Sequence, residues 1–339
     1  MTEEIAKMRT ANSEQLNYCP LFSIIIPVYN CEKYVARTLD SLINQNYHLR
    51  NYEIIIVNDG SKDSSGKICD NYAEKFPFIH VTHTQNFGQS HARNVGLKQC
   101  TGDFIMWCDA DDIVSPSLIS VLTRAIELHN DVDIFVYNYC NELKSGNWPE
   151  YREFESVYVD NEEACLYIGG YREKWGGFLW NKAVRRKIAE NIYMDEKMKI
   201  FLDMKWLLEV LASNKDAKIL WLNCCLYCYI IYPGVGVTRN VKGLYTSKGC
   251  SWGVKDYERI MLIKNLSPRM KRNIASKLCA HAFSNFYQRP IKPTPGVIRK
   301  INLVFRKYIC TFYRNSDISI KYKLKMFIKH IFFCLNIHK

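Results

Sequence analysis

Three carboxylates lie close together in this sequence, at Asp109, Asp111 and Asp112. Carboxylates at such short spacing repel one another unless a cation or hydrogen-bond donors offset their charge. Mg²⁺ binds one or two carboxylates together with phosphate oxygens, and Mn²⁺ favours the same oxygen ligands. This D-x-D triplet therefore predicts a metal ion that bridges a diphosphate. An acidic turn ahead of a helix starting near Pro116 is the alternative that the residues alone leave open.

Two more charged residues indicate a nucleotide site. Asp59 follows an apolar run and precedes Gly60, where its carboxylate can accept a hydrogen bond from a base or a ribose hydroxyl. An ordinary Asp-Gly turn is the alternative. Arg93 can hold a phosphate, with a surface ion pair as the alternative. A Walker phosphate loop is missing because Ile68 replaces the required Ser or Thr, and no G-x-G-x-x-G follows the first apolar run, which argues against a dinucleotide dehydrogenase.

These residues need a regular scaffold, and the pattern of the chain predicts one. From residue 22 onward, short β-rich runs alternate with segments of helical length. We expect strands at residues 22–27, 53–58, 79–83, 103–108 and 133–139, and helices at residues 32–44, 64–75, 88–99 and 116–129. Apolar strands separated by helices indicate a parallel sheet covered on both faces. Ligands bind such sheets at the carboxyl ends of the strands, where the candidate residues fall.

The pattern is weaker beyond residue 150. It predicts a strand at residues 153–159, helices at residues 160–168 and 201–213, and a buried strand at residues 218–232. The almost apolar stretch 219–237 is also long enough to span a bilayer. Because Asn223, Pro233 and two glycines interrupt it, we expect a core strand that leads into a loop.

Four motifs, in this order, carry a resemblance to a known family. They are Ile-Ile-Pro-Val-Tyr-Asn, a strand ending in Asn-Asp-Gly-Ser, Asn-x-Gly-x-Ser-x-Ala-Arg-Asn, and the D-x-D triplet. Over residues 22–140 the chain resembles the donor-binding domain of family 2 glycosyltransferases with the GT-A fold. The resemblance implies an α/β domain whose Rossmann-like, mostly parallel sheet has helices on both faces and binds a nucleotide sugar.

The resemblance also implies which residues bind the donor. In similar enzymes the Pro-Val-Tyr-Asn loop cradles the nucleotide, the Asp of Asp-Gly-Ser contacts a uracil-type base, and the D-x-D residues contact the ribose and the metal ion. Asp111 would therefore hold the divalent cation, Mn²⁺ or Mg²⁺, and Arg93 would lie at the diphosphate. The complete set implied for donor binding is Pro27, Tyr29, Glu32, Asp59, Gly88, Arg93 and Asp109.

A segment further along implies the catalytic base. Trp180 and Lys182 belong to a Trp-Asn-Lys segment like that of the family, where they would contact acceptor or phosphate. About twenty residues later the family places Glu-Asp, whose Asp is the base; here the pair is Leu202-Asp203, so the base is kept and its acidic neighbour is lost. The implied reaction is a single displacement with inversion, in which Asp203 takes the proton of the acceptor hydroxyl.

The expected function follows from these roles. We expect a hexosyltransferase that moves a sugar from a nucleotide diphosphate sugar, a UDP-sugar by resemblance, to a glycan or lipid-linked saccharide in cell-surface polysaccharide biosynthesis. The Gln-x-x-Arg-Trp motif and membrane spans of processive synthases are not found, so one sugar is added per encounter. The alternative is a non-catalytic nucleotide-sugar-binding subunit of a polysaccharide assembly complex. The missing Glu before Asp203 favours that alternative, whereas the retained D-x-D triplet opposes it.

Charge is distributed unevenly along the 339 residues, of which 48% are apolar. The net charge is +12, yet residues 261–339 contain 17 Lys and Arg against the single acid Asp317, a local charge of +16. Residues 1–260 therefore carry −4. A basic tail on a neutral-to-acidic body is suited to an anionic partner, either a membrane surface or nucleic acid. Since no nucleic-acid recognition motif occurs, we expect no nucleic-acid partner, and a membrane surface is left as the candidate anionic partner.

Helical spacing at residues 319–337 separates an apolar face from a basic one. Leu324, Phe327 and Ile331 fall on the apolar face, and Lys321 and Lys325 fall on the other. A helix of this kind lies in a membrane interface. It can also dock its apolar face on the body of the protein, and both alternatives stay open.

Four regions are expected along the chain. They are an N-terminal extension (1–20), the donor-binding half of the GT-A domain (21–140), its acceptor-binding half (141–250) and a helical, basic C-terminal region (251–339). The charged first twenty residues argue against a secretory signal peptide, and the 14 scattered cysteines argue against a disulfide framework. We therefore expect a cytoplasmic protein, attached to the inner face of the cytoplasmic membrane if its C-terminal helix binds lipid.

Overall fold

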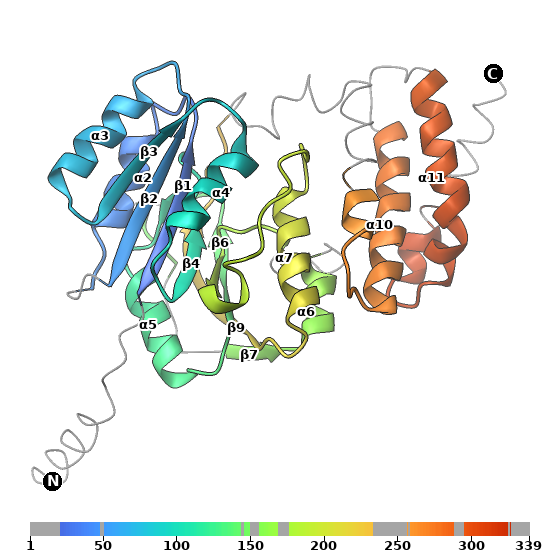
Figure 1. The fold of residues 1–339 in the computed structure, drawn as a ribbon. Helices are drawn as coiled ribbons and strands as arrows, with labels where there is room; N and C mark the ends of the chain where they lie inside the picture. Colours follow the sequence, from blue (N-terminus) through green and yellow to red (C-terminus); the bar gives the residue numbers. More distant parts are fainter. Residues whose placement is uncertain are drawn as a thin grey trace, which may run out of the picture.

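The computed structural model describes residues 21–47, 51–143, 146–149, 156–168, 176–232, 256, 258–287, 295–324 and 326. In this part of the chain one sheet lies between two layers of helices, and two further helices stand beside one of those layers (Figure 1). The expected α/β architecture, with helices on both faces of the sheet, is confirmed.

The sheet formed by the described residues is mixed. Its strands are β1 (Phe22–Val28), β2 (Tyr52–Asp59), β3 (Ile79–Thr84), β4 (Phe104–Trp107), β5 (Ile113–Val114), β6 (Ile134–Cys140), β7 (Ser156–Val159), β8 (Lys182–Arg185) and β9 (Ile219–Cys228). The order is β3-β2-β1-β4-β8-β6-β9-β5, with β7 paired to β9. The first four strands in this order are parallel, and β8 is antiparallel to both β4 and β6. Therefore β6 and its parallel neighbour β9 run in the direction of β1, and the carboxyl ends of all these parallel strands meet at one edge.

Helices pack on both faces because alternate strand residues point to opposite sides. The helices are α2 (Val35–Ile43), α3 (Ser65–Lys75), α4 (Gln89–Gln99), α5 (Leu118–Leu128), α6 (Asn161–Ile168), α7 (Leu202–Ser213), α10 (Pro268–Tyr287) and α11 (Pro295–Arg314). In β1, Ile24 and Ile26 belong to the core shared with α2, α3 and α5. Ile25 between them belongs to the opposite core, which includes residues of α4, α6 and α7. The continuous apolar run of β1 thus supplies both cores.

The elements of the first 140 residues lie within three residues of their predicted ends. The short strands β5 and β8 were not predicted, because so few residues give no recognisable period. Strand β9 is confirmed, but it ends at Cys228 and not at residue 232. The reason is that the N–H of Ile230 donates to a carboxylate oxygen of Asp112 at 2.8 Å, which takes the chain away from the sheet. Among the described helices, none is long and apolar enough to cross a bilayer.

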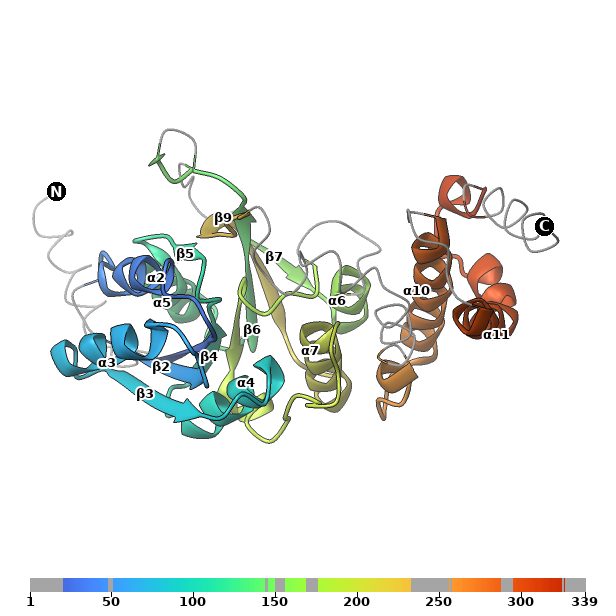
Figure 2. The ribbon, with the colours of Figure 1, turned by 90° about the horizontal axis from the view of Figure 1, so that it is seen from above.

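Helices α10 and α11 form an appendage beside α6 and α7 (Figures 1 and 2). Helix α10 lies between the body and α11 in both views, so α11 is the outermost element on this side. Ile274 and Leu278 of α10 and Phe312 of α11 belong to the same hydrophobic cluster as Leu207 and Leu211 of α7. The appendage is therefore joined to the main domain by a continuous apolar core.

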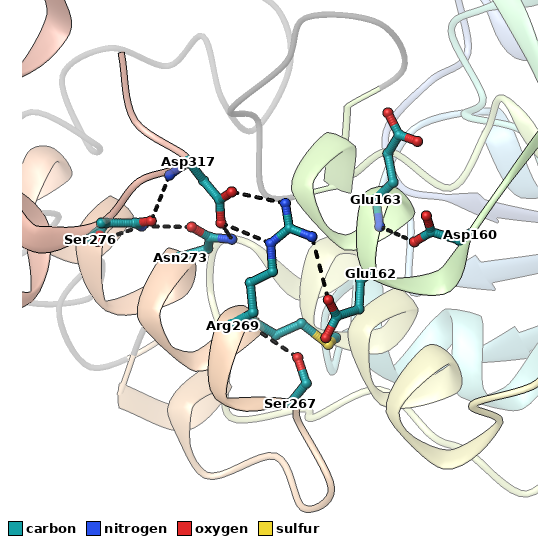
Figure 3. Close-up of polar contacts among 10 residues, drawn as sticks. Asp160, Glu162, Glu163, Ser267, Arg269, Asn273, Ser276 and Asp317 are labelled. Atoms are coloured by element: carbon teal, nitrogen blue, oxygen red, sulfur yellow. Dashed lines mark hydrogen bonds and ion pairs between the residues drawn. The ribbon is translucent and has the colours of Figure 1, made fainter. Parts of the chain in front are cut away.

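A partly exposed polar network reinforces this junction (Figure 3). Arg269 donates to both carboxylate oxygens of Asp317, at 3.1 and 2.9 Å, and lies 3.4 Å from Glu162 of α6. Asn273 donates to Asp317 at 2.9 Å. The hydrogen bonds from Arg269 lower the pKa of Asp317. Asp317, the single acid of residues 261–339, thus holds α10 to the turn that follows α11.

The predicted C-terminal helix lies only partly within the described residues. Its first turn contains Ile320, which is 83% exposed, and Leu324, which is 58% exposed. Ile318 and Met326 are buried in the cluster formed with α10 and α7. Within the described part of this segment Met326 packs on the protein, whereas Leu324 of the predicted apolar face is exposed. Residues 325 and 327–339 lie outside the described part.

Candidate active site

Loops at the carboxyl ends of β1 and β2 are tied together. The N–H of Asn30 donates to Ser61 Oγ at 3.0 Å, and Asn30 Oδ1 accepts from the N–H of Lys62 at 2.8 Å. Glu32 Oε2 accepts from the N–H of Ser64 at 2.9 Å. Asn30 has φ of 52°, a left-handed conformation that Asn adopts more easily than most residues. Glu32 was predicted to bind the nucleotide sugar. One of its carboxylate oxygens joins the two loops.

Asp59 connects these loops to a third one. Its side chain is buried, with Oδ1 accepting from the N–H of Phe87 at 2.9 Å and Oδ2 from the N–H of Gly88 at 2.8 Å. Gly88 has φ of 99°, which a glycine adopts without strain. Asp59 therefore holds the loop that begins α4. At the same edge, Pro27 is half-buried and Tyr29 is 42% exposed.

The last acid of the D-x-D triplet is part of the scaffold. Asp112 is fully buried, and its two oxygens accept from the hydroxyl of Tyr227 and the N–H of Ile230, each at 2.8 Å. The Tyr227 hydroxyl also accepts from the N–H of Asp109 at 3.1 Å. Burial, with the nearby charge of Asp109, raises the pKa of Asp112 to about 8. Strand β9 thereby fixes the loop that carries the triplet.

Arg93 links the D-x-D triplet to the start of α7. It is 2% exposed, and it donates to Asp109 Oδ1 at 3.1 Å and to Asp203 Oδ1 at 2.5 Å. Burial by itself would lower the pKa of Arg93, but the two carboxylates outweigh this effect and raise it. Burial raises the pKa of Asp109 to about 6; Arg93 opposes this shift, whereas Asp203 and Asp111 add to it. The guanidinium of Arg93 thus stabilises the negative charges of Asp109 and Asp203, which it brings together.

The start of α7 is held by α4. Asp203 lies in the first turn of α7, where the helix dipole favours a negative charge. Asn94, next to Arg93, donates to the carbonyl of Met194 at 3.0 Å and accepts from its N–H at 2.7 Å. Asn94 also donates to Glu196 at 2.9 Å. Two neighbouring residues of α4 therefore fix both Asp203 and the segment that leads to it.

Asp256 and the backbone conformation of Phe201 also help to position Asp203. Asp256 accepts from the N–H groups of Lys199 and Ile200, both at 2.9 Å. Phe201 then has φ of 58°, the left-handed region that non-glycine residues seldom adopt. Such a conformation persists only where surrounding contacts impose it. The chain is thus turned sharply just before it presents Asp203.

Trp180 and Lys182 are both buried. The ammonium of Lys182 donates to the carbonyl oxygens of Phe178 and Gly176, at 2.7 and 3.2 Å, and to Asn181 Oδ1 at 2.7 Å. Burial lowers the pKa of Lys182 to about 7, and the charge of Asp203 opposes this shift. Trp180 is 3% exposed. The side chain of Lys182 therefore binds the backbone of residues 176–178, and Trp180 packs in the core beside it.

The residues at the D-x-D triplet fit a divalent cation shared with a phosphate. Asp109 and Asp111 are partly exposed, whereas both oxygens of Asp112 are engaged by protein groups. Within the described ranges, no group of three or more His, Cys, Asp or Glu is arranged to hold a metal ion by itself. One or two carboxylates completed by phosphate oxygens is the arrangement that Mg²⁺ prefers. Burial is the main cause of the raised pKa of Asp109, and the carboxylates of Asp203 and Asp111 add to it, so a cation bound here would favour the ionised form.

The structure brings together Asp109, Arg93 and Asp203, which lie far apart in the sequence. Asp59 and Gly88 meet in a neighbouring loop. The roles of Asn94 and Asp256 could not be predicted from the sequence, because their partners lie in the distant segment 194–200. Tyr227 lies in the predicted buried strand 218–232, whose apolar pattern does not indicate the contact of its hydroxyl with Asp112.

Comparisons with known proteins agree with this geometry. The model of glycosyl transferase family 2 matches residues 23–194, about half of the chain. The chain therefore belongs to this family of sugar-transferring enzymes.

Individual relatives are more distant. "Uncharacterized glycosyltransferase EpsJ" of Bacillus subtilis is 32% identical over 205 residues, which are 59% of this chain and 59% of EpsJ. "Minor teichoic acid biosynthesis protein GgaB" of the same organism is 33% identical over 208 residues, 60% of this chain but 22% of GgaB. The matched part thus spans less than two thirds of either relative. A crystal structure of S. aureus TarS with UDP-GlcNAc has a TM-score of 0.63 at 20% identity, covering 86% of this chain and 81% of that one, which confirms the GT-A fold.

Proposed function

We propose that the protein is an inverting glycosyltransferase that moves a sugar from a nucleotide diphosphate sugar to a saccharide acceptor. The observation that carries this proposal is the position of Asp203, which shares the guanidinium of Arg93 with Asp109 of the D-x-D triplet. A carboxylate is thereby held next to the edge of the sheet where a donor diphosphate would bind. A base beside a donor site is what a single displacement requires.

In the proposed reaction the acceptor hydroxyl attacks the anomeric carbon on the face opposite the diphosphate. The new carbon–oxygen bond forms as the bond to the diphosphate oxygen breaks, so that the configuration inverts. The nucleoside diphosphate leaves with the electron pair of the broken bond. Asp203 accepts the proton of the hydroxyl, and Arg93 keeps the carboxylate of Asp203 in place.

Asp111, with Asp109 beside it, would hold Mn²⁺ or Mg²⁺. When bound, such a cation supplies positive charge against the leaving diphosphate. Arg93 is 2% exposed, and its two amino groups bind Asp203 and Asp109, so its charge is directed at these two carboxylates. The chain's own contribution is therefore to present partly exposed carboxylates at a fixed edge of the sheet.

The donor half consists of residues 21–140 and the acceptor half of residues 141–250 in this proposal. A UDP-sugar donor is supported by the complex of TarS with UDP-GlcNAc, whose fold is similar. A role in cell-surface polysaccharide biosynthesis is supported by the relative GgaB, which is named for teichoic acid biosynthesis. Glu32, Asp59 and the loop at Gly88 join three strand ends into the rim on which the nucleotide would lie.

The C-terminal region adds a proposed location, on the cytoplasmic face of an anionic membrane. Arg299, Arg306 and Arg314 of α11 are exposed, and they lie on one stripe of the helix together with Leu303, which is 62% exposed. Exposed cations and an apolar side chain on one helical face suit a lipid surface with negative headgroups. An enzyme placed there would meet lipid-linked saccharides.

The function is tested with Asp203→Asn. The amide keeps the shape of the side chain but accepts no proton, so we expect transfer to fall by roughly 10²–10⁴-fold. Binding of the nucleotide sugar should change little. The measurement is release of UDP from a panel of UDP-sugars with Mn²⁺ and methyl pyranosides, together with thermal-shift titration of each donor. Absence of UDP release by the wild-type protein with every donor would favour the non-catalytic subunit.

The same assay tests the metal ion. Asp111→Asn and EDTA treatment of the wild type should each reduce turnover by orders of magnitude and leave the unfolding temperature nearly unchanged. Asp216→Asn, at an exposed position after α7, is the matched control. Full turnover in EDTA would show that no metal ion takes part.

A further inference from the structure

A column of stacked aromatic rings ends at an exposed face. Phe178 and Trp180 stack with centroids 4.9 Å apart and an interplanar angle of 14°. Trp180 in turn stacks on Tyr227 at 4.7 Å and 15°, and on Tyr229 at 5.5 Å and 8°. Trp180 is 3% exposed, whereas Phe178 is 41% exposed. Phe178 is thus the partly exposed end of the column, with Trp180 stacked on its ring and Gly176 close to one of its edges.

The column begins at the D-x-D loop. The hydroxyl of Tyr227 binds Asp112 at 2.8 Å and the N–H of Asp109 at 3.1 Å. Two stacking steps lead from Tyr227 through Trp180 to Phe178. The exposed ring is therefore attached to the same loop that would hold the donor.

Gly177, the residue before Phe178, packs against the start of α7. The Cα of Gly177 approaches Met204 so closely that a β-carbon placed on it would lie 3.1 Å from that side chain. Met204 follows Asp203 in the first turn of α7. The ammonium of Lys182 donates a hydrogen bond of 2.7 Å to the carbonyl oxygen of Phe178, which fixes the backbone at this residue. The segment of Phe178 thus contacts the first turn of α7 through Gly177, and the ring of Phe178 is linked to the D-x-D loop through Trp180 and Tyr227.

We propose that Phe178 is a stacking platform for a pyranose ring of the acceptor saccharide. One face of a pyranose exposes C–H groups, and burying that face on an aromatic ring removes apolar surface from water. A flat ring held from behind by two further aromatic layers loses little conformational freedom when it binds. This proposal rests on the proposed function, since it names the substrate that reaches Asp203.

The same column explains why Trp180 does not take this role itself. It is 3% exposed, because the rings of Phe178, Tyr227 and Tyr229 all stack against it. Its function is to transmit the orientation of the D-x-D loop to the exposed ring. The acceptor contact expected from the Trp-Asn-Lys segment is thereby displaced by two residues, to Phe178.

The experiment is saturation-transfer NMR with methyl pyranosides of glucose, galactose and N-acetylglucosamine, which requires no catalysis. Phe178→Leu keeps Trp180 covered but removes the flat ring, and Phe178→Tyr keeps the ring. Tyr158→Leu, at an exposed aromatic residue of β7, is the matched control. We expect the wild type to saturate one face of at least one pyranoside, with binding weakened on the order of 10-fold in Phe178→Leu. Phe178→Tyr and Tyr158→Leu should bind like the wild type.

Hydrolysis of UDP-sugar in the absence of acceptor is measured on the same proteins. It should be equal in all of them, because Phe178 lies outside the donor site. The proposal is overturned if the wild type transfers saturation to no pyranoside, or if Phe178→Leu binds pyranosides as the wild type does. It is also overturned if Phe178→Leu loses donor hydrolysis together with pyranoside binding. If the wild type binds pyranosides but does not hydrolyse any UDP-sugar, the result would count against the glycosyltransferase reaction. It would not count against Phe178 as a platform.

Discussion

Residues of the D-x-D triplet differ in role although they are the same amino acid. Asp109 and Asp111 are partly exposed, and Asp109 shares Arg93 with Asp203. Asp112 is fully buried, and its two oxygens accept hydrogen bonds from Tyr227 and Ile230. A buried carboxylate without a cationic partner is more easily kept protonated than ionised. The third acid therefore acts as a structural link whose charge state matters for stability.

This difference predicts a pH-dependent stability. The pKa of Asp112 is raised to about 8 in the folded protein, against 3.8 as its ordinary value. The folded state then binds more protons than the unfolded one between these values, so this group's contribution to stability is present below pH 3.8 and is lost as the pH rises through about 8. We expect Asp112→Asn to gain stability relative to the wild type as the pH rises from 5 to about 8. Thermal unfolding in EDTA at several pH values measures it.

The exposed Asp216→Asn serves as the reference for this comparison. Its difference from the wild type should not vary across the same pH range. A loss of stability in Asp112→Asn that is equal at every pH would show that Asp112 stays ionised and is held by Tyr227 and Ile230 as an anion.

Among the elements, α4 has the greatest influence on the site. Through Arg93 it reaches the D-x-D triplet and Asp203, and through Asn94 it reaches the segment that leads into α7. The loop that begins it is held by Asp59 at Gly88. Helix α4 therefore connects the proposed nucleotide rim, the metal-binding edge and the base. A displacement of this helix would disturb all three together.

Asn94→Ala tests this connection. It leaves the N–H and carbonyl of Met194 without their side-chain partner, which costs about 1–3 kcal/mol of stability. We expect the turnover number to fall because Asp203 is displaced, while donor binding stays close to that of the wild type. Kinetics of UDP release at saturating donor, with thermal unfolding alongside, measure both effects.

Asn161→Ala is the matched control for Asn94→Ala. Asn161 also binds two backbone groups, the carbonyls of Leu211 and Asn214, at the opposite end of α7. Its loss should lower stability with little effect on turnover. Equal losses of turnover in the two variants would mean that general destabilisation, and not the position of Asp203, is responsible.

At the scale of the whole molecule, the charge of the tail is presented on an outer surface. Helix α10 packs on the body, and α11 lies outside it (Figure 2). Asp317, the one acid of residues 261–339, is turned inward to Arg269. The exposed cations of α11 therefore have no acid of this region beside them on the surface. The apolar residues Ile318 and Met326, by contrast, belong to the core, so removing the C-terminal segment would damage the fold.

The membrane proposal is therefore best tested by charge reversal on α11. Each cation near an anionic surface contributes on the order of 1 kcal/mol, so Arg299→Glu with Arg306→Glu should weaken binding by roughly 30-fold or more. Sedimentation with vesicles containing phosphatidylglycerol measures it, and vesicles of phosphatidylcholine alone give the background. Lys67→Glu with Lys75→Glu, both exposed on α3, makes the same change in charge elsewhere.

Release by the α11 variant alone would support the proposed surface. Equal release by both double variants would mean that net charge and not this face governs attachment. Binding of the wild type to phosphatidylcholine as strong as to phosphatidylglycerol would contradict an electrostatic contact.

The sequence by itself determined the parallel half of the sheet, its helices and the family. These features depend on periodic apolar patterns and on short motifs, which are local properties of the chain. It also indicated Asp203 and the D-x-D triplet as functional residues. The mixed half of the sheet was less predictable, because the pairing of β8 between β4 and β6 depends on contacts between distant segments and not on local pattern.

Only the tertiary structure decided which of the indicated residues act on one another. Arg93, expected at a phosphate, lies between Asp109 and Asp203, which are 16 and 110 positions away in the chain. Whether Trp180 or Phe178 is the exposed ring of its segment depends equally on what packs behind it, here Tyr227 from β9. Partners of buried charges and the exposure of rings are set by the packing of remote elements, and no local pattern in the sequence records them.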